Sequence, residues 1–252
     1  MKLLAFDTST DTMSVAVQSN DSGGKPGLWQ TTGAGGAQAS SSLIPTVLDL
    51  MAQSGLSFAE LDAIVFGRGP GAFTGLRTAC SVAQGLGFGA QGRAGGRSVP
   101  LLPVDTLLAV AEQARQQHAP GNAPLRVFSM LDARMDQVYA SVYAFDGLGW
   151  QQQGDILLDR PENLFVDGSC GQPGDVLAGN VFTAYGERLT FGAGCARIEA
   201  LPTATAMLRL APALLALGNG VIAELALPIY IRDKVAQTTS ERAAAKAAAL
   251  SP

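Results

Sequence analysis

The segment from Ala63 to Arg77 reads AIVFGRGPGAFTGLR, and it decides the fold of the region around it. Its first four residues form a short continuous apolar run, which predicts a buried strand. The glycine-rich stretch from Gly67 follows at once, and a helix is expected from about Thr74 to Leu86. A glycine loop between a strand and a helix can present backbone N–H groups to an anion.

The spacing of these glycines matches neither established nucleotide-binding motif. A P-loop needs Lys and then Ser or Thr after its last glycine, whereas Leu76 and Arg77 follow Gly75. A dinucleotide fingerprint needs a third glycine where this chain has Ala72, and an acidic residue about twenty positions later. Two interpretations remain open, a tight strand-to-helix connection or a contact surface. Phe73 favours the second, because aromatic and arginine side chains are typical anchors of interfaces.

The first third of the chain predicts a three-stranded antiparallel meander. Apolar or alternating stretches predict three antiparallel strands, at residues 3–6, 14–18 and 28–32. The first strand ends at Asp7, and a turn rich in hydroxyl side chains follows at 8–12. A helix is expected at 42–53, because its apolar residues fall on one face and Gly55 provides a stop.

The same pattern returns in the middle of the chain. An apolar strand at 127–131 ends at Asp132, and an alternating strand follows at 138–145. A long internal repeat is typical of a duplicated, two-lobed fold. We therefore expect a first lobe at 1–98 that is completed by 204–235, a second lobe at 99–203 and a flexible tail at 236–252.

The composition limits the chemistry that this chain can carry. Its 252 residues include one histidine, His118, in a stretch that predicts a helix end running into a loop. This count excludes Ser-His-Asp and Cys-His catalysis in ordinary arrangements, and zinc sites built on several imidazoles. The net charge of -4 argues against direct binding to nucleic acid, whose phosphates are bound mainly by Lys and Arg.

The cysteines and the hydropathy pattern favour the cytoplasm. Cys80, Cys170 and Cys195 are far apart and form no C-x-x-C pair, which argues against a disulfide framework. The N-terminal apolar run reaches an acid after four apolar residues, and no stretch of about 18 apolar residues follows. We therefore expect neither a signal peptide nor a membrane span.

Four blocks, in order across most of the chain, resemble the TsaB (YeaZ) family of bacterial threonylcarbamoyladenosine synthesis. They are AFDTSTDTMSVAV at 5–17, FGRGPGAFTGLR at 66–77 with AQGLG at 83–87, LDARMDQVYASVY at 131–143, and PIYIR at 228–232. The glycine-rich block is the most specific of them. The resemblance implies an α/β protein with an actin-like, hexokinase-like (ASKHA, RNase H-like) fold of two related lobes.

The resemblance also implies a partner subunit without chemistry of its own. The catalytic sibling, a TsaD-like threonylcarbamoyl transferase, holds a metal with an H-x-x-x-H pair on its first helix and acts on tRNAs that read codons beginning with A. Here the corresponding region, Gly35 to Pro45, reads GGAQASSSLIP and contains no histidine. The implied partners are this sibling, a TsaE-like ATPase subunit and, in isolation, a second copy of the chain. Contact with tRNA is expected to be indirect.

Two groups of site residues follow from the resemblance, with no catalytic residue and no metal ligand among them. The remnant of a phosphate loop would be Asp7, Thr8, Ser9 and Thr10, although Asp7 is expected mainly to organise its turn. No cofactor is expected on the isolated chain, whereas the complex could hold ATP or ADP with magnesium. The expected partner interface comprises Leu43, Val47, Met51, Arg68, Pro70, Phe73, Thr74 and Arg77.

Two enzymatic alternatives remain open. An actin-like ATPase or small-molecule kinase would use Asp7 and Asp132 around a metal-nucleotide. Against it, the nearest second glycine motif is the unconvincing stretch at 178–180, and there is no clear base. A metallopeptidase is the weaker alternative because the chain has a single histidine.

Overall fold

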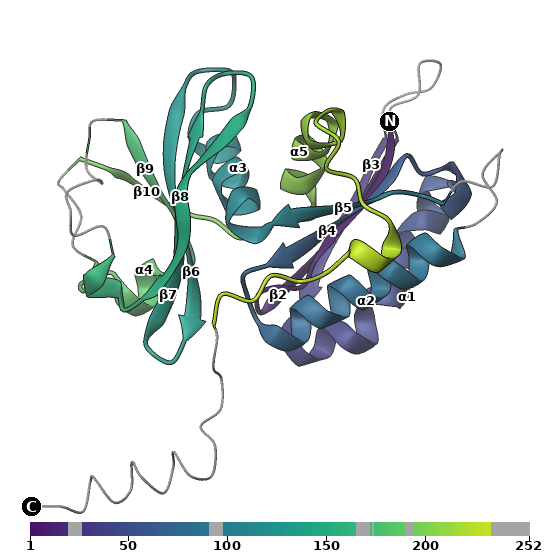
Figure 1. Ribbon diagram of the computed structural model, residues 1–252, viewed down its shortest axis with the longest axis horizontal. Helices are drawn as coiled ribbons and strands as arrows, with labels where there is room; N and C mark the ends of the chain where they lie inside the picture. The colour runs from purple at the N-terminus through teal and green to yellow at the C-terminus, as the bar shows by residue number, and fades with distance from the viewer. Residues whose placement is uncertain (20–26, 91–97, 165–171, 173, 190–193, 233–252) are drawn as a thin grey trace, which may run out of the picture.

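Two five-stranded mixed sheets stand side by side and define two lobes (Figure 1). The computed structural model describes residues 1–19, 27–90, 98–164, 172, 174–189 and 194–232. The tail predicted at 236–252 lies outside these residues.

The first sheet has the strand order β3-β2-β1-β4-β5. Its strands are β1 (Lys2–Asp7), β2 (Thr12–Ser19), β3 (Gly27–Ala34), β4 (Ala63–Gly69) and β5 (Leu101–Asp105). The first three form the predicted antiparallel meander, and β4 and β5 continue the sheet in parallel to β1. Strands β1 and β4 are buried along almost their whole length, as expected for strands covered on both faces.

Helices cover both faces of this sheet (Figure 1). They are α1 (Ala39–Ser54) and α2 (Phe73–Gly89) on one face and α5 (Ala204–Ala216) on the other. The predicted helices at 42–53 and 74–86 are therefore confirmed, each with additional residues at its ends. The core beneath α1 and α2 includes Phe6, Val15 and Phe66 from the strands.

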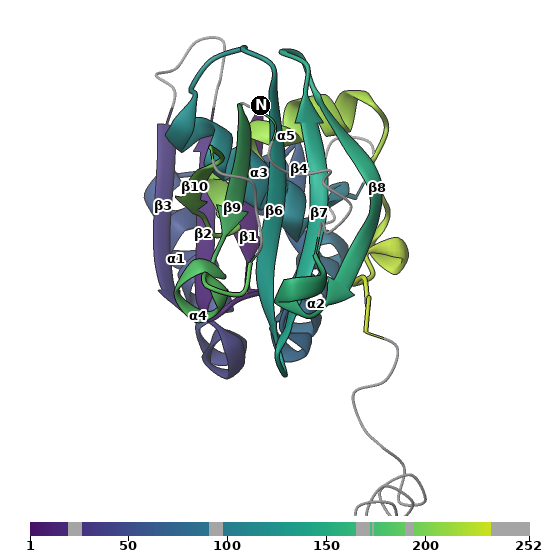
Figure 2. The same cartoon turned by 90° about the vertical axis from the view of Figure 1, so that its left-hand side faces the viewer.

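The second sheet has the order β10-β9-β6-β7-β8. Its strands are β6 (Leu125–Arg134), β7 (Gln137–Phe145), β8 (Trp150–Asp159), β9 (Asp175–Gly179) and β10 (Ala196–Glu199). Like the first sheet, it joins a meander of three antiparallel strands to two parallel ones. Helix α3 (Thr106–His118) covers its inner face, and the short α4 (Phe182–Tyr185) packs on the outer face (Figure 2).

The boundary between the lobes lies later than the predicted position after residue 98. Strand β5 pairs with β4, from Ile64 opposite Leu101 to Gly69 opposite Asp105, so it belongs to the first sheet. The first lobe therefore extends through Asp105 before it is completed by α5. We call residues 226–232 the strap. This segment runs from α2 to the β6–β7 turn (yellow in Figure 1).

Candidate functional site

The turn after β1 is folded around the carboxylate of Asp7. Oδ1 of Asp7 accepts hydrogen bonds from the backbone N–H of Ser9 (2.9 Å) and from the Ser9 hydroxyl (2.7 Å). The Thr8 hydroxyl donates to the carbonyl oxygen of Gly75 at 2.7 Å. The Thr10 hydroxyl donates to a carbonyl two residues further on, at 3.1 Å. All three hydroxyls of this turn therefore donate to protein acceptors.

The glycine-rich segment lies directly on this turn. The backbone N–H of Ala72 donates to the carbonyl oxygen of Ser9 at 2.7 Å. A Cβ atom added at Gly71 would stand 2.5 Å from that oxygen, and one added at Gly75 would stand 1.8 Å from the carbonyl oxygen of Thr8. Glycine is needed at both positions because the two backbones approach so closely. These glycines serve the packing of α2 onto the turn, as the tight-connection interpretation proposed.

This packing does not fit a nucleotide phosphate at the predicted phosphate loop. Asp7, Thr8 and Ser9 are buried, and the two hydroxyls and Oδ1 of the carboxylate are engaged with the protein. The backbone of residues 71–75 packs directly against the carbonyls of Thr8 and Ser9. Of the four predicted residues, Ser9 and Thr10 reach the pocket described below. The turn is arranged as a structural element.

The second carboxylate oxygen of Asp7, Oδ2, is buried without a hydrogen-bond partner. It faces Gly67 of β4, where an added Cβ atom would lie 1.8 Å from it. Burial raises the pKa of Asp7 to about 6, against the lowering effect of the two hydrogen bonds from Ser9. Asp7 is therefore a buried acid whose charged form is destabilised, and it does not line the pocket.

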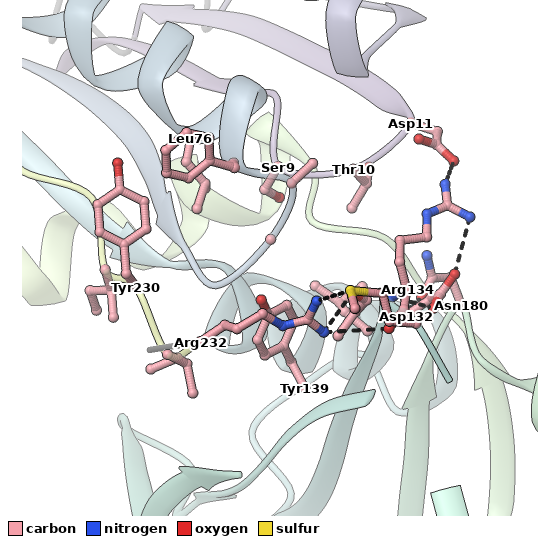
Figure 3. A pocket seen from close by; sticks show the side chains of 18 of the residues that line it. Ser9, Thr10, Asp11, Leu76, Asp132, Arg134, Tyr139, Asn180, Tyr230 and Arg232 are labelled. Atoms are coloured by element: carbon pink, nitrogen blue, oxygen red, sulfur yellow. Dashed lines mark hydrogen bonds and ion pairs between the residues drawn. The ribbon is translucent and has the colours of Figure 1, made fainter. Parts of the chain in front are cut away.

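A pocket of about 790 Å³ lies between the two lobes and the strap (Figure 3). The first lobe lines it with residues 9–11 and with the start of α2, including Phe73, Leu76 and Arg77. The second lobe contributes residues 131–135, Tyr139 and Asn180, and residues 229–232 of the strap complete the lining. The volume is in the range typical of small-molecule sites.

Arg134 joins the two lobes at one end of this pocket. Its guanidinium group pairs with Asp11 of the first lobe and with Asp132 of its own lobe, the latter at 3.2 Å. Asp132 also accepts a hydrogen bond from the hydroxyl of Tyr185 at 3.0 Å, and its backbone N–H donates to Oδ1 of Asn180 at 2.9 Å. Both carboxylates at this end of the pocket are therefore engaged by protein groups.

The two aspartates that an ATPase would need do not face the same space. Asp132 lines the pocket, whereas Asp7 is buried beneath the turn. Among the described residues, no three His, Cys, Asp or Glu side chains are grouped as metal ligands would be. Gly179 belongs to the nearest second glycine motif. It packs against the backbone of Met130, because a Cβ atom added at Gly179 would lie 1.8 Å from the carbonyl oxygen of Met130. The residues present therefore do not fit a metal-nucleotide site of that type.

The β6–β7 turn is held between the lobes by contacts on two sides. Arg134, Met135 and Asp136 all have left-handed backbone angles, with φ of 61°, 56° and 62°. From the strap, Arg232 donates to the turn carbonyls and to Oε1 of Gln137, the last at 2.8 Å. Figure 3 shows Arg232 reaching this turn from the strap, while Arg134, which is part of the turn, points toward Asp11. Sequence reasoning missed both arginines, although LDARMDQVYASVY and PIYIR contain them.

An exposed aromatic cluster stands at the start of α2, where the contact-surface interpretation placed an interface. The guanidinium carbon of Arg77 lies 3.8 Å from the ring centroid of Phe73, and its Nε donates to the hydroxyl of Tyr230 at 3.1 Å. The rings of Phe73 and Tyr230 are 5.3 Å apart, and both side chains remain almost half exposed. We call Phe73, Arg77 and Tyr230 the aromatic cluster. Tyr230, from the strap, was not predicted.

Three residues of the predicted interface on α1 are placed wrongly. Leu43, Val47 and Met51 are buried in the core of the first lobe and cannot touch a partner. A helix that covers a sheet buries its most apolar stripe against that sheet. The large apolar side chains of α1 that are exposed are instead Ile44 and Leu48, each one position after a buried residue and so at the edge of the apolar stripe.

The other predicted interface residues divide into buried and exposed positions. Pro70 is buried, so it is also corrected to a structural position. Arg68 is half-buried, and its Nε donates to Oδ1 of Asp105 at 2.6 Å. Thr74 is exposed, as are Phe73 and Arg77 of the aromatic cluster. The accessible part of the prediction is therefore the first turn of α2.

The single histidine, the cysteines and the helices of the described residues can now be placed in the fold. His118 is exposed at the end of α3, and the region from Gly35 to Pro45 forms a 3-10 turn and then the start of α1. Cys80 and Cys195 are free thiols, and Cys170 lies outside the described residues. None of the helices in the described part of the chain is both long and apolar enough to cross a bilayer.

Comparisons with known proteins give a consistent family. A family model described as "TsaD: tRNA N6-adenosine threonylcarbamoyltransferase" matches residues 36–178. The "tRNA threonylcarbamoyladenosine biosynthesis protein TsaB" of Haemophilus influenzae is 38% identical over 143 residues, 56% of this chain and 53% of that protein. The structure of "YeaZ from Pseudomonas aeruginosa" superimposes with a TM-score of 0.76 at 34% identity, covering 91% of this chain and 99% of that one.

The relative from Escherichia coli (strain K12), also described as "tRNA threonylcarbamoyladenosine biosynthesis protein TsaB", matches over nearly the whole of both chains. It is 30% identical over 246 residues, which cover 94% of this chain and 96% of the relative. The match therefore includes both lobes. On this full-length similarity, and on the two-lobed actin-like fold that it shares with YeaZ, the chain belongs to the TsaB (YeaZ) family.

Proposed function

We propose that this chain is a non-catalytic partner subunit in the formation of threonylcarbamoyladenosine in tRNAs that read codons beginning with A. It would act with a catalytic TsaD-like transferase and a TsaE-like ATPase in the cytoplasm. Similarity over nearly the whole chain to one protein named for this biosynthesis, and over about half of the chain to another, supports the pathway. The observation that carries the non-catalytic role is the state of the turn at Asp7–Ser9, which is buried beneath the glycine-rich segment instead of open to a ligand.

Exposed apolar and aromatic side chains on α1 and α2 support a docking role for the first lobe. Helices α1 and α2 lie next to each other on one face of the first sheet (Figure 1). Ile44 and Leu48 of α1 are about half exposed, and the aromatic cluster lies at the start of α2. Exposed aromatic, arginine and aliphatic side chains of this kind are typical of interface anchors. In our proposal the transferase binds here, and a second copy of the chain takes its place in isolation.

Replacing Phe73 by Ala together with Arg77 by Glu should weaken the complex with the transferase about 30-fold, the equivalent of about 2 kcal/mol for a hot spot. The change removes the stacked ring and reverses the charge without altering the core. Affinity is measured by calorimetry or by surface plasmon resonance with the purified partner. Leu148→Ala, at a highly exposed leucine of the second lobe, is the control and should leave the affinity unchanged.

A second pair of variants separates docking from folding. Ile44→Ala should reduce partner binding and leave the thermal midpoint nearly unchanged, because its side chain is exposed. Leu43→Ala, at the neighbouring core position, should cost about 2 to 5 kcal/mol of stability. An unchanged complex with both Phe73→Ala/Arg77→Glu and Ile44→Ala would place the interface on another face.

The proposed function is tested by reconstituting tRNA threonylcarbamoylation from purified components with and without this chain. Omission should abolish product formation, and addition of the chain alone to tRNA and substrates should give none. Calorimetry with ATP and magnesium is expected to show no binding to the isolated chain, since any nucleotide would be held in the complex. Equal product without the chain would contradict the proposal.

A further inference from the structure

The pocket between the lobes carries an imbalance of charge, of which the proposed function uses only Arg77. Three arginines and two aspartates line it. Both aspartates are engaged by Arg134. This leaves Arg77 and Arg232 without a carboxylate partner among the described residues.

The two remaining arginines are held in place by neutral groups. Arg77 stacks on Phe73 and donates to the hydroxyl of Tyr230. Arg232 donates to backbone carbonyls of the β6–β7 turn, to the Gln137 amide and to the sulfur of Met135. Its Nε is buried and has no partner within the described part of the chain. Neutral acceptors orient a guanidinium group but leave its charge uncompensated, so an anion in the pocket would be stabilised.

Aromatic and aliphatic surface lies beside these charges. Tyr139 is nine-tenths buried and lines the pocket next to Arg232 (Figure 3). Burial raises the pKa of its hydroxyl, while the nearby charge of Arg232 lowers it, so the hydroxyl is a neutral donor at physiological pH. Leu131, Ile229 and Ile231 add apolar surface.

We infer that this pocket binds a small aromatic carboxylate or phosphate, with the anion at Arg232 and Tyr139 and the ring against the apolar wall. Of the turn at Asp7–Ser9, only Ser9 lines this pocket, and its hydroxyl already donates to Asp7. Binding in this pocket goes beyond the proposed function and does not rest on it, because the chain alone contributes every lining residue named.

The test uses the full chain, without any partner, and four probes. Phenyl phosphate and benzoate carry both a ring and a charge, benzyl alcohol carries the ring alone, and inorganic phosphate carries the charge alone. Binding is followed by chemical-shift changes of backbone amides and methyl groups, which detect affinities in the millimolar range. The two aromatic anions should shift signals of Ala133, Tyr139 and Ile231, and should bind at least about tenfold more tightly than the neutral or ring-free probes, as expected for charge-assisted hydrogen bonds.

Variants connect the binding to the named residues. Arg232→Gln should weaken both aromatic anions about tenfold or more, and Tyr139→Phe, which keeps the ring and the packing, should weaken them several-fold. Arg197→Gln makes the same change of charge at an exposed position of β10 outside the pocket, and should have no effect. A preference for phosphate over carboxylate, or the reverse, identifies the anion.

Three results would overturn this inference. Benzyl alcohol could bind as tightly as benzoate, which would make the pocket simply apolar. The shifted signals could lie outside the pocket. Binding could also survive both Arg232→Gln and Tyr139→Phe unchanged. Because the probes are titrated into the isolated chain, none of these results bears on the reconstitution of tRNA modification, and failure of the reconstitution would leave this inference intact.

Discussion

Gly75→Ala should destabilise the first lobe by about 3 kcal/mol or more, at the upper end of the cost of overpacking. The new methyl group would stand 1.8 Å from the carbonyl oxygen of Thr8, which is a backbone atom and cannot rotate away. Helix α2 would have to move off the turn, and the hydrogen bonds from Thr8 to Gly75 and from Ala72 to Ser9 would lengthen or break. In a chain of this size, a loss of about 3 kcal/mol lowers the thermal midpoint by roughly 6 to 12 °C.

Gly85→Ala, on the same helix, is the matched control and should have the opposite sign. Nothing lies within 4 Å of a Cβ atom added at Gly85, and the residue is exposed. Because alanine favours a helix over glycine, this change should stabilise the protein by about 0.5 to 1 kcal/mol. Denaturant unfolding of both variants measures the difference. If Gly75→Ala were as stable as Gly85→Ala, the close contact between α2 and the turn would be wrong.

The elements around these glycines could be predicted from the sequence, but the role of each glycine could not. The strand at 63–66 and the helix after the glycine segment follow from apolar pattern and glycine content alone, and both are confirmed. The sequence left open whether the glycines serve a connection or a contact surface. The structure assigns the two roles to different residues: Gly71 and Gly75 pack on the turn, whereas Phe73 and Arg77 are exposed.

The wrongly placed interface on α1 has a simple physical cause. Leu43, Val47 and Met51 belong to the apolar stripe of α1, and such a stripe packs first against the helix's own sheet. The residues available to a partner are the apolar ones off that stripe, Ile44 and Leu48. An apolar residue at a position that the helical period predicts to be exposed is therefore the better signal for docking.

The pocket could not be predicted from local pattern, because its parts are far apart in the chain. The pair of Arg134 with Asp11 joins residues from different lobes, and Arg232 reaches the β6–β7 turn from the strap. No periodicity encodes such pairs. The strands β8, β9 and β10 were also missed: β8 is mostly exposed and β10 has four residues, so neither shows a strong apolar pattern, and β9 is a buried run of five residues.

Asp7→Asn should increase the stability of the protein at neutral pH by up to about 3 kcal/mol, and this gain should disappear in acid. The pKa of Asp7 rises from 3.8 to about 6 in the folded protein. Below about pH 4 the carboxyl group is neutral in both the folded and the unfolded chain, so it contributes no penalty. Between about pH 4 and pH 6 the unfolded chain loses its proton first, and the wild-type protein loses stability as the pH rises.

Above about pH 6 the carboxyl group is ionised in both states, and the penalty is complete. Its size follows from the pKa shift, since each unit corresponds to about 1.4 kcal/mol. The amide that replaces the carboxylate keeps an oxygen for the two hydrogen bonds from Ser9 and carries no charge, although its NH₂ group takes the place of the unpartnered Oδ2. The free-energy cost of burying this NH₂ group does not depend on pH. The measured quantity is therefore the change, between about pH 4 and pH 7, in the difference in unfolding free energy between Asp7→Asn and wild type.

Glu60→Gln provides a control of opposite sign. Hydrogen bonds from Ser57 lower the pKa of Glu60 to about 2, with a smaller contribution from Lys2. A lowered pKa contributes stability above the unfolded value and loses it as the pH falls, so Glu60→Gln should become relatively less stable as the pH rises. The change for Glu60→Gln should fall mostly between about pH 2 and pH 4.5, with a nearly flat profile above it, whereas Asp7→Asn should gain relative stability between about pH 4 and pH 6. Parallel pH profiles would mean that Oδ2 of Asp7 has a partner in solution, and that this turn, although covered by the glycine segment, remains open to a ligand or to water.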